Sequence, residues 1–228
     1  MKAIAGPIRR LVPSSIKRPV KRWLYPDWHK GLVGGDWEEI GKLQFDFWLK
    51  QGLKPEHYFL DIGCGALRAG VHFIRYLEAG HYFGVDNNEE ALDAGRQVEL
   101  VKHGLIHKNP TLVPMNDFDF RSLGVEFDYA TAHSVFPHLT LNSSILCIMN
   151  LEKVLVPGGK CYATFFENPQ GKFNLDPIAR SHLTTYFDKP IFHYGFKTFE
   201  WICEGTSLKV EYVGDWTMDQ KMMVFTKI

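Results

Sequence analysis

The chain has 228 residues and a mass of 26.2 kDa, and its 26 Lys and Arg side chains balance 26 Asp and Glu side chains. That length fits one α/β domain with a short extension rather than two full domains. An apolar fraction of 45% and a charged fraction of 23% exclude disordered and collagen-like chains. No apolar stretch approaches the roughly 18–20 residues that a membrane-spanning helix needs. A net charge of zero excludes a uniformly basic protein that coats nucleic acid.

Four cysteines are spread widely along the chain, at Cys64, Cys147, Cys161 and Cys203, and none forms a C-x-x-C pair. This spacing predicts neither a zinc ribbon nor a disulfide framework. We therefore expect no metal site and a reducing, cytoplasmic location.

The first 30 residues are strongly basic. They contain eight Lys and Arg side chains and one acid, Asp27, so this segment carries a charge of +7 and the rest of the chain −7. Prolines recur every six or seven residues and prevent one long helix. Three interpretations are open: an arm packed on its own acidic domain, a peripheral contact with a membrane surface or another anionic partner, and a transit peptide. We treat residues 1–35 as a basic N-terminal arm.

From residue 36 onward, apolar residues recur with the helical period in some segments and form short buried runs in others. Pro157-Gly158-Gly159 predicts a turn before a strand, and the segment 167–194, rich in Pro, Asn and Phe, predicts an irregular cap. In chain order, the sequence predicts a helix at 36–52, a strand at 58–62, a helix at 68–79, a strand at 81–86, a helix at 89–104, strands at 111–115 and 127–133, a helix at 142–155, a strand at 160–166, a helix at 197–204, and strands at 208–214 and 220–227.

Strands that alternate with helices predict an α/β fold, a doubly wound parallel sheet with helices on both faces, over residues 36–228. In such a sheet, ligands bind outside the carboxyl ends of the strands. The first strand ends in Asp61-Ile62-Gly63-Cys64-Gly65, where glycines let the backbone pass close beneath a ligand. Asp86 ends the second strand, and its two carboxylate oxygens suit two adjacent ribose hydroxyls.

Two classes of nucleotide-like ligand share this geometry. A nicotinamide dinucleotide favours G-x-G-x-x-G/A, but the sixth position counted from Gly63 is Arg68. A pyrophosphate would also be repelled by Asp61, whereas a carboxylate there suits the amino or sulfonium group of S-adenosylmethionine. These residues favour S-adenosylmethionine over a dinucleotide.

The order of these markers resembles a class I S-adenosylmethionine-dependent methyltransferase over roughly residues 36–228. The markers are Asp61-x-Gly63-x-Gly65, Asp86 after the second strand, Asp117 after the third, and Pro157-Gly158-Gly159 before the fifth. Trp37-x-x-x-Gly41-x-x-Gln44-Phe45 and the glycine motif also look like a bacterial branch of small-molecule or sugar methyltransferases. The resemblance implies a Rossmann-like seven-stranded sheet whose last strand is antiparallel. One departure is Leu67, which stands where the family often has a third glycine.

The resemblance also implies roles for individual residues, with S-adenosyl-L-methionine as cofactor and S-adenosyl-L-homocysteine as product. Asp86, next to Asn87, would take the ribose hydroxyls, although Asp86 could instead cap the helix that follows. Asp61 would hold the methionine amino group, directly or through water, or else cap loop amides. The remaining candidates for cofactor contact are Gly63, Cys64 and Gly65 beneath the cofactor, Asn116, Asp117 and Phe118 beside the adenine, and His133.

The end of the fourth strand decides the reaction subtype, and it reads Ala132-His133-Ser134-Val135-Phe136-Pro137-His138. It lacks the Asn/Asp-Pro-Pro-aromatic run of exocyclic-amine methyltransferases, the paired acids of arginine methyltransferases and the magnesium-binding Asp of catechol-type enzymes. Neutral imidazole fits removal of a hydroxyl proton near neutral pH. His138, His133 and His193 are therefore the candidate general bases, each of which could instead order a loop or contact the cofactor.

Aromatic side chains make a shaped acceptor pocket plausible, and we select Trp37, Phe45, Phe136 and Tyr194 as candidate substrate contacts. The sequence as a whole favours O-methylation of a small molecule or glycan. The alternatives are an RNA or protein methyltransferase that docks through the basic arm, and a non-catalytic S-adenosylmethionine-binding protein. The neutral overall charge disfavours a nucleic-acid partner.

Overall fold

The computed structural model describes residues 27–32, 36–169 and 174–228. Most of the basic arm, residues 1–26 and 33–35, lies outside the described residues, so the three interpretations of that arm stay open. Within the described ranges, no helix combines the length and the apolar character needed to cross a membrane.

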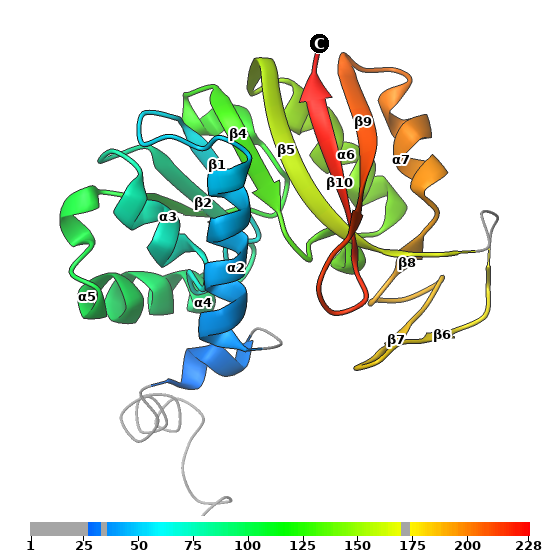
Figure 1. Ribbon diagram of the computed structural model, residues 1–228, viewed down its shortest axis with the longest axis horizontal. Helices are drawn as coiled ribbons and strands as arrows, with labels where there is room; N and C mark the ends of the chain where they lie inside the picture. The colour runs from blue at the N-terminus through cyan, green and yellow to red at the C-terminus, as the bar shows by residue number, and fades with distance from the viewer. Residues whose placement is uncertain (1–26, 33–35, 170–173) are drawn as a thin grey trace, which may run out of the picture.

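A central sheet organises the molecule (Figure 1). Its main path runs in the order β3-β2-β1-β4-β5-β10-β9; β1, β2, β3, β4 and β5 are mutually parallel, and β10 is antiparallel to both neighbours. The bounds are β1 (Phe59–Ile62), β2 (Tyr82–Asp86), β3 (Thr111–Pro114), β4 (Phe127–Ala132), β5 (Leu155–Glu167), β9 (Leu208–Asp215) and β10 (Lys221–Lys227). The predicted fold class, with an antiparallel last strand, is confirmed, and the structure places that strand between β5 and β9.

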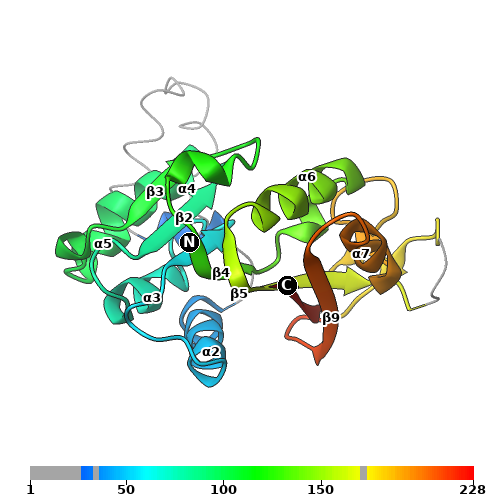
Figure 2. The same cartoon turned by 90° about the horizontal axis from the view of Figure 1, so that it is seen from above.

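Helices cover both faces of this sheet, because side chains alternate between its two sides along each strand. Leu60 packs with α6 and α7 in one core cluster, whereas its neighbour Phe59 packs with α2 and α3 in another. Figure 2 shows α2 and α3 on one side of the sheet and α6 on the other. The helical bounds are η2 (Trp28–Leu32), α2 (Trp37–Lys50), α3 (Gly70–Tyr76), α4 (Glu89–Ala94), η3 (Gly95–Glu99), α5 (Leu100–Lys102), η4 (Ile106–Lys108), η5 (Phe120–Leu123), η6 (Phe136–His138), α6 (Leu141–Glu152) and α7 (Phe196–Cys203).

The predicted helix at 89–104 is interrupted. Residues Gly95–Glu99 form a π-helical turn between α4 and α5. A π turn holds one more residue than an α turn. The inward stripe therefore shifts: Leu100 is buried, and Val101, which an unbroken helix would turn inward, is 56% exposed.

Pro157-Gly158-Gly159 lies inside β5 rather than before it. Partner residues across β4 and β5 shift from Phe127 opposite Leu155 to Tyr129 opposite Lys160, so the three-residue excursion is a bulge in the ladder. A Cβ on Gly159 would lie 2.8 Å from the Val156 carbonyl oxygen. The lack of a side chain at Gly159 allows this close approach.

The cap predicted at 167–194 contains short strands and is not wholly irregular. β6 (Ile178–Ala179) and β7 (Thr184–Thr185) form an antiparallel pair, and β8 (His193–Tyr194) extends the main sheet by pairing with the end of β5. The cap is therefore attached to the sheet edge at which β5 ends.

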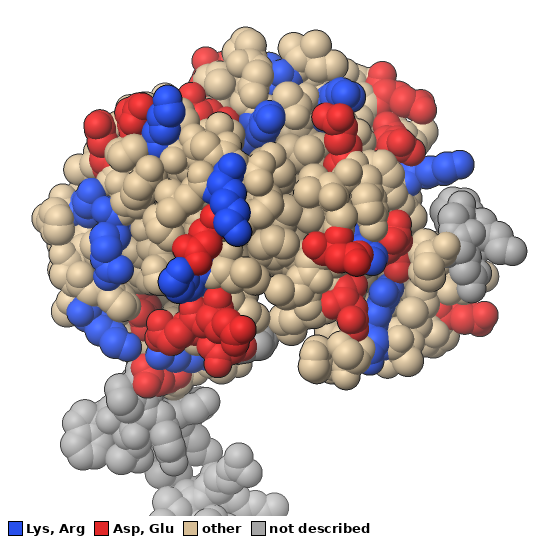
Figure 3. All heavy atoms as spheres, in the orientation of Figure 1, with Lys and Arg blue, Asp and Glu red and all other residues tan. Residues whose placement is uncertain are grey.

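The segment before α2 packs on the domain through one buried pair. His29 and Glu99, both with no exposed side-chain surface, bring Nε2 and Oε1 to 2.6 Å, so η2 is tied to the π turn. Asp36, Glu38 and Glu39 then open α2, with Asp36 capping the helix by accepting from the Glu39 amide. Figure 3 shows acidic side chains gathered around the start of this helix.

Candidate functional site

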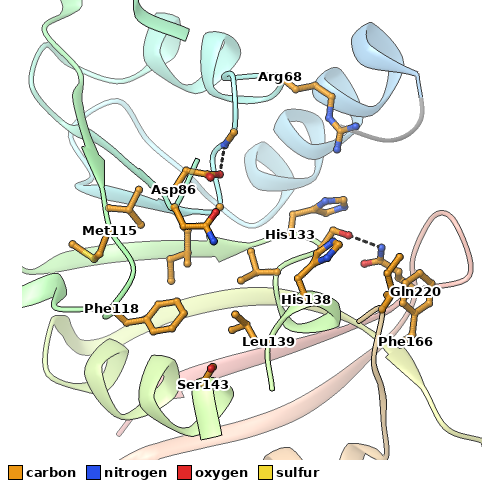
Figure 4. Close-up of a pocket in the computed structure, with 18 of the residues that line it drawn as sticks. Arg68, Asp86, Met115, Phe118, His133, His138, Leu139, Ser143, Phe166 and Gln220 are labelled. Carbon is orange, nitrogen blue, oxygen red and sulfur yellow. Dashed lines mark hydrogen bonds between the residues drawn. The ribbon is translucent and has the colours of Figure 1, made fainter. Parts of the chain in front are cut away.

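A cavity of about 590 Å³ opens at the carboxyl ends of β1, β2, β4 and β5 (Figure 4). The chain leaves β1 toward β2 on one side and returns to β4 on the other, so the cavity lies at the switch point of the sheet. We call the part built from the ends of β1, β2 and β3 the donor half, and the part built from the ends of β4 and β5, the cap and the β9–β10 loop the acceptor half. The donor-half lining is Ile62, Gly63, Gly65, Arg68, Val85, Asp86, Asn87, Met115, Asn116 and Phe118. The acceptor-half lining is His133, Ser134, Val135, His138, Leu139, Ser143, Phe166, Leu183, Ile191, Met218 and Gln220.

The glycine-rich turn after β1 makes the floor of the donor half. Gly63 has φ +74° and Gly65 has φ +54°, a left-handed backbone that glycine adopts without strain. A Cβ on Gly63 would lie 2.6 Å from Cγ2 of Val135, so any side chain there would collide with the β4 loop. The turn therefore offers bare backbone to a ligand lying across it.

Leu67 replaces the third glycine of the motif without opening the turn. It takes the left-handed conformation itself, at φ +70°, and is fully buried. Its side chain fills the space over Gly70, where a Cβ would lie 2.7 Å from Leu67 Cδ2. Leu67 thus supplies the core packing that joins α3 to the turn, and the missing glycine leaves the turn intact.

Asp86 lies at the rim of the donor half with its carboxylate held by two backbone donors. The Gly65 amide donates to Oδ2 and the Asn88 amide donates to Oδ1, each over 2.8 Å. Asn88, rather than Asp86, caps α4 through the Ala91 amide. An ionised carboxylate has about four acceptor positions, so two stay available for adjacent hydroxyls of a ligand. Asn87 lines the cavity beside it.

Asp61 is buried one step behind the cavity wall. It is 6% exposed and accepts a 2.6 Å hydrogen bond from the Tyr82 hydroxyl. Burial raises the pKa of Asp61 from 3.8 to about 7, although the Tyr82 hydrogen bond opposes this rise. The guanidinium of Arg68 lines the cavity on the same loop, and burial lowers its pKa. A buried acid near its titration point thus lies behind the cavity wall, close to a cation that lines the cavity.

The wall below β3 combines apolar surface with one amide side chain. The cavity is lined here by Met115, Asn116 and Phe118, and the side chains of Met115 and Phe118 contribute apolar surface. Asp117 does not line it and accepts instead from the backbone amide of Asp119. Of the three residues predicted beside an adenine, the neighbours of Asp117 are therefore the ones placed to contact a ligand.

His133 is held in one tautomer by an indole. The Trp216 Nε1–H donates to His133 Nε2 over 2.5 Å, and an indole nitrogen can only donate. The lone pair of Nε2 is therefore occupied and the ring proton sits on Nδ1, which is buried and has no hydrogen-bond partner among the described residues. Burial, with Arg68 nearby, lowers the pKa of His133 to about 3. Neither ring nitrogen of His133 is therefore placed to act as a base in the cavity.

His138 ends η6 with its imidazole at the cavity mouth (Figure 4). Its backbone amide donates to the Val135 carbonyl, which fixes the turn, while the ring makes no hydrogen bond to the described residues. Partial burial lowers the pKa of His138, so the ring is neutral at neutral pH. Both of its nitrogens remain available to a ligand.

A closed ring of hydrogen bonds supports the wall beside His138. The Ser134 amide donates to Thr164 Oγ1, the Thr164 hydroxyl donates to Gln220 Oε1, and Gln220 Nε2 donates to Ser134 Oγ, over 2.7, 2.5 and 2.9 Å. Ser134 adopts φ +59° within this ring, a strained conformation for a residue with a Cβ. The ring leaves the Ser134 hydroxyl proton free to point into the acceptor half.

Comparison with known proteins points to methyltransferases. Residues 60–161 match the model of a methyltransferase domain family. An uncharacterised methyltransferase of Schizosaccharomyces pombe is 28% identical over 115 residues, which are 47% of this chain and 39% of that protein. Residues 60–161 are thus identified as a methyltransferase domain.

Solved methyltransferase structures share its fold. Magnesium protoporphyrin IX methyltransferase from Synechocystis PCC 6803, crystallised with S-adenosylmethionine, superimposes with a TM-score of 0.62 at 12% identity, covering 94% of this chain and 96% of its own. CalS10, an amino pentose methyltransferase from Micromonospora echinaspora, also bound to S-adenosylmethionine, gives 0.60 at 15% identity, covering 90% and 97%. At this identity the likeness shows the fold, and the acceptors of those enzymes are their own.

The donor half fits S-adenosylmethionine, the ligand bound in those two solved structures. The bare backbone at Gly63 and Gly65 allows close approach, and the Asp86 carboxylate keeps two acceptor positions. Cys64 is buried behind the wall and burial raises the pKa of its thiol, which keeps it protonated. The prediction that Cys64 is a small residue beneath the cofactor stays a prediction.

Not every residue predicted to act on the acceptor lines the cavity. His193 is 4% exposed inside the cap, where Nε2–H donates to the Asn174 carbonyl and Nδ1 accepts from the Thr185 hydroxyl. Both ring nitrogens are used, so His193 orders the cap and does not line the cavity. Of the three candidate bases, His133 has its Nε2 occupied by Trp216, and His138 lines the cavity with a ring that makes no hydrogen bond to the described residues.

The four aromatic rings selected as substrate contacts also serve packing. Trp37 joins a small core cluster under α4, Phe45 stacks on His72, Phe136 is 1% exposed in the main core, and Tyr194 donates its hydroxyl to the Leu139 carbonyl. Aromatic composition alone does not separate rings in a core from rings in a pocket, and these four do not line the cavity.

Sequence reasoning missed other lining residues of the acceptor half. Leu183 and Ile191 come from the cap and Met218 and Gln220 from the β9–β10 loop. Their position depends on pairings between distant segments, so the local sequence held no signal for them. Ser143, at the first turn of α6, follows the predicted strand end closely and could have been found by its place in the chain.

Proposed function

We propose that the methyltransferase transfers a methyl group from S-adenosyl-L-methionine to a hydroxyl oxygen of a small molecule or glycan, with His138 as general base. One observation carries this proposal. His138 presents a neutral, unpartnered imidazole to the acceptor half, and no carboxylate side chain of the described residues lines that half. A neutral base suits a hydroxyl acceptor, whereas a cationic amine acceptor would call for acidic partners.

Each polar or charged group around the donor half would have its own role in holding the cofactor. Asp86 would accept hydrogen bonds from both ribose hydroxyls through its two remaining acceptor positions. Asp61 would bind the methionine ammonium, directly or through water, and Arg68 its carboxylate. Asn116 and Phe118 would contact the adenine. When bound, S-adenosyl-L-methionine supplies a methyl group on a cationic sulfur that leaves as neutral S-adenosyl-L-homocysteine.

The acceptor half would orient the hydroxyl and take its proton. Holding the acceptor oxygen in line with the methyl group supplies most of the acceleration, on the order of 7–11 kcal/mol at best. A general base adds about 10²–10⁴-fold. His138 would remove the hydroxyl proton, and the Ser134 hydroxyl, held by Gln220, would hydrogen-bond the acceptor oxygen. Apolar side chains around His138 would exclude competing water.

A fractionated transfer assay tests the proposed acceptor class. Labelled S-adenosyl-L-methionine is incubated with the protein and a host extract, and label is measured in metabolites, glycans, protein and RNA. We expect label in the metabolite or glycan fraction with the parent protein and none with Asp86→Ala. Label in protein or RNA would contradict the proposal and favour docking through the basic arm.

A paired substitution tests the proposed base. His138→Asn should lower turnover by about 10²-fold or more while leaving the affinity for S-adenosyl-L-homocysteine unchanged. The matched control His107→Asn removes an exposed histidine that does not line the cavity. Near-parental turnover in His138→Asn, with the control also active, would rule out His138 as the base.

A further inference from the structure

The acceptor half has an uneven lining. Six of its side chains are apolar and contributed by four different segments: Val135 and Leu139 after β4, Phe166 at the end of β5, Leu183 and Ile191 from the cap, and Met218 from the β9–β10 loop. Most of the polar groups, by contrast, sit together: His133, His138 and Gln220 lie near one another, whereas Ser143 lies apart on α6 (Figure 4). An acceptor would meet hydrogen-bonding groups on one side and apolar side chains around the rest of its body.

No charged side chain of the described residues lines this half. The charged lining groups of the cavity, Arg68 and Asp86, come from the donor half. Arg180 stacks over the Phe166 ring and donates to the Glu167 carbonyl, so its charge is engaged away from the cavity. Asp219 is engaged with the amide and hydroxyl of Ser181. The acceptor half is therefore neutral as well as apolar.

Several of the polar groups are committed to the protein. Gln220 uses its oxygen on Thr164 and one amide hydrogen on Ser134, and the Ser143 hydroxyl is hydrogen-bonded to the Thr140 hydroxyl. The His138 imidazole, the Ser134 hydroxyl proton and the second amide hydrogen of Gln220 are left to engage an acceptor. These few groups can satisfy one reacting hydroxyl, whereas each hydroxyl buried against the apolar side chains would cost about 1–3 kcal/mol.

The apolar wall is held in place by the cap. His193 bridges the two sides of the cap from its interior, and Ser181 ties the cap to the β9–β10 loop through Asp219. Leu183 directly precedes β7 and Ile191 directly precedes Phe192, and both side chains are partly buried in the cap. The side chains that surround the acceptor therefore belong to an ordered surface.

We propose that the acceptor is an uncharged molecule with an apolar body and a single reacting hydroxyl, a hydrophobic alcohol or phenol, selected by the cap residues Leu183 and Ile191. This inference rests on the proposed function and narrows it. A glycan carries many hydroxyls that the wall would leave without partners, and RNA or a basic peptide carries charges that the lining does not match. The acceptor class thus follows from the neutrality of the lining and from its small number of free polar groups.

A binding experiment with defined probes tests this inference without requiring the natural acceptor. The full chain is saturated with S-adenosyl-L-homocysteine and titrated with 2-naphthol, with methyl α-D-glucopyranoside as the polar probe and 6-hydroxy-2-naphthoate as the anionic probe. We expect 2-naphthol to bind at least about tenfold more tightly than either of the others, because burying two apolar rings is favourable here and burying extra hydroxyls or a charge is not.

Two cap variants link the binding to the proposed wall. Leu183→Asn should weaken 2-naphthol binding at least about tenfold, because it replaces apolar contact by an amide. Leu175→Asn, at a 72% exposed cap position outside the cavity, should leave binding unchanged. S-adenosyl-L-homocysteine should bind all three proteins equally, which also reports that the variants are folded.

The results distinguish failure of this inference from failure of the proposed function. Equal or tighter binding of the glycoside or the anion, no binding of 2-naphthol, or binding that Leu183→Asn leaves unchanged would overturn the inference while the proposed donor site stands. Failure of the parent protein to bind S-adenosyl-L-homocysteine would instead overturn the proposed function on which the inference rests.

Discussion

Asp61→Asn should change how protein stability depends on pH. Burial raises the pKa of this carboxyl from 3.8 to about 7, so the folded protein binds a proton that the unfolded chain has released. Stability contributed by the protonated form is therefore present below pH 3.8 and is lost as the pH rises to about 7. At 1.36 kcal/mol for each pKa unit, the loss amounts to about 4 kcal/mol.

The Asp61→Asn variant has no carboxyl group to ionise at this position, so it does not lose this stability as the pH rises. Its amide oxygen can still accept from the Tyr82 hydroxyl, but its amide group brings a buried donor that costs about 1 kcal/mol if it finds no partner. We expect Asp61→Asn to be about 1 kcal/mol less stable than the parent near pH 4 and about 3 kcal/mol more stable at pH 8. The difference in the free energy of unfolding should change sign between these two values.

Urea unfolding of both proteins at intervals from pH 4 to pH 9 measures this difference directly. If the variant is less stable by the same amount at every pH, the carboxyl is ionised in the folded protein and the burial argument is wrong. The same variant should bind S-adenosyl-L-methionine more weakly, since the methionine ammonium loses its carboxylate. A gain in stability with a loss in affinity is the pattern expected of a residue kept for binding.

Three further substitutions test separate parts of the site. Trp216→Phe frees the Nε2 lone pair of His133, so the pKa of His133 should rise above about 3 in an NMR titration while burial and Arg68 still hold it below 6.5, and an unmoved pKa would count against the indole contact. Gly63→Ala forces a Cβ to within 2.6 Å of the β4 loop at a left-handed φ, so thermal unfolding should report a loss of about 1–3 kcal/mol, whereas a parental melting temperature would show that the turn is not constrained. Thr164→Val leaves a backbone amide and the Gln220 oxygen without partners, so urea unfolding should report a loss of about 2–4 kcal/mol, and a loss below about 1 kcal/mol would mean that the hydrogen-bonded ring is not closed in solution.

The positions of several donor-half residues could be predicted because their signals are local. Asp61 and Asp86 lie at the ends of β1 and β2 and the two glycines follow β1, and a strand end fixes where the next residues lie in a doubly wound sheet. The order of helices and strands was equally readable from periodicity. The departures were local events that break a period: the π turn at Gly95–Glu99 and the bulge within β5.

The acceptor half could not be predicted in the same way. The role of His133 depends on Trp216, which lies 83 residues further along the chain, and the role of His193 depends on its burial inside the cap. Phe136 has the same chemistry in the core as it would have in a pocket. Contacts between residues far apart in the sequence determine the roles of these residues, and such contacts cannot be read from composition.

The affinity for S-adenosyl-L-homocysteine, measured by calorimetry on the parent, Asp86→Ala and Asp46→Ala, tests the central claim most directly. Asp46 is a matched carboxylate in an exposed ion pair on α2, away from the cavity. Loss of two hydrogen bonds to a charged acceptor should cost at least about 2 kcal/mol, or about 30-fold in affinity, in Asp86→Ala alone. Equal affinities in all three proteins would contradict the assignment of the donor site.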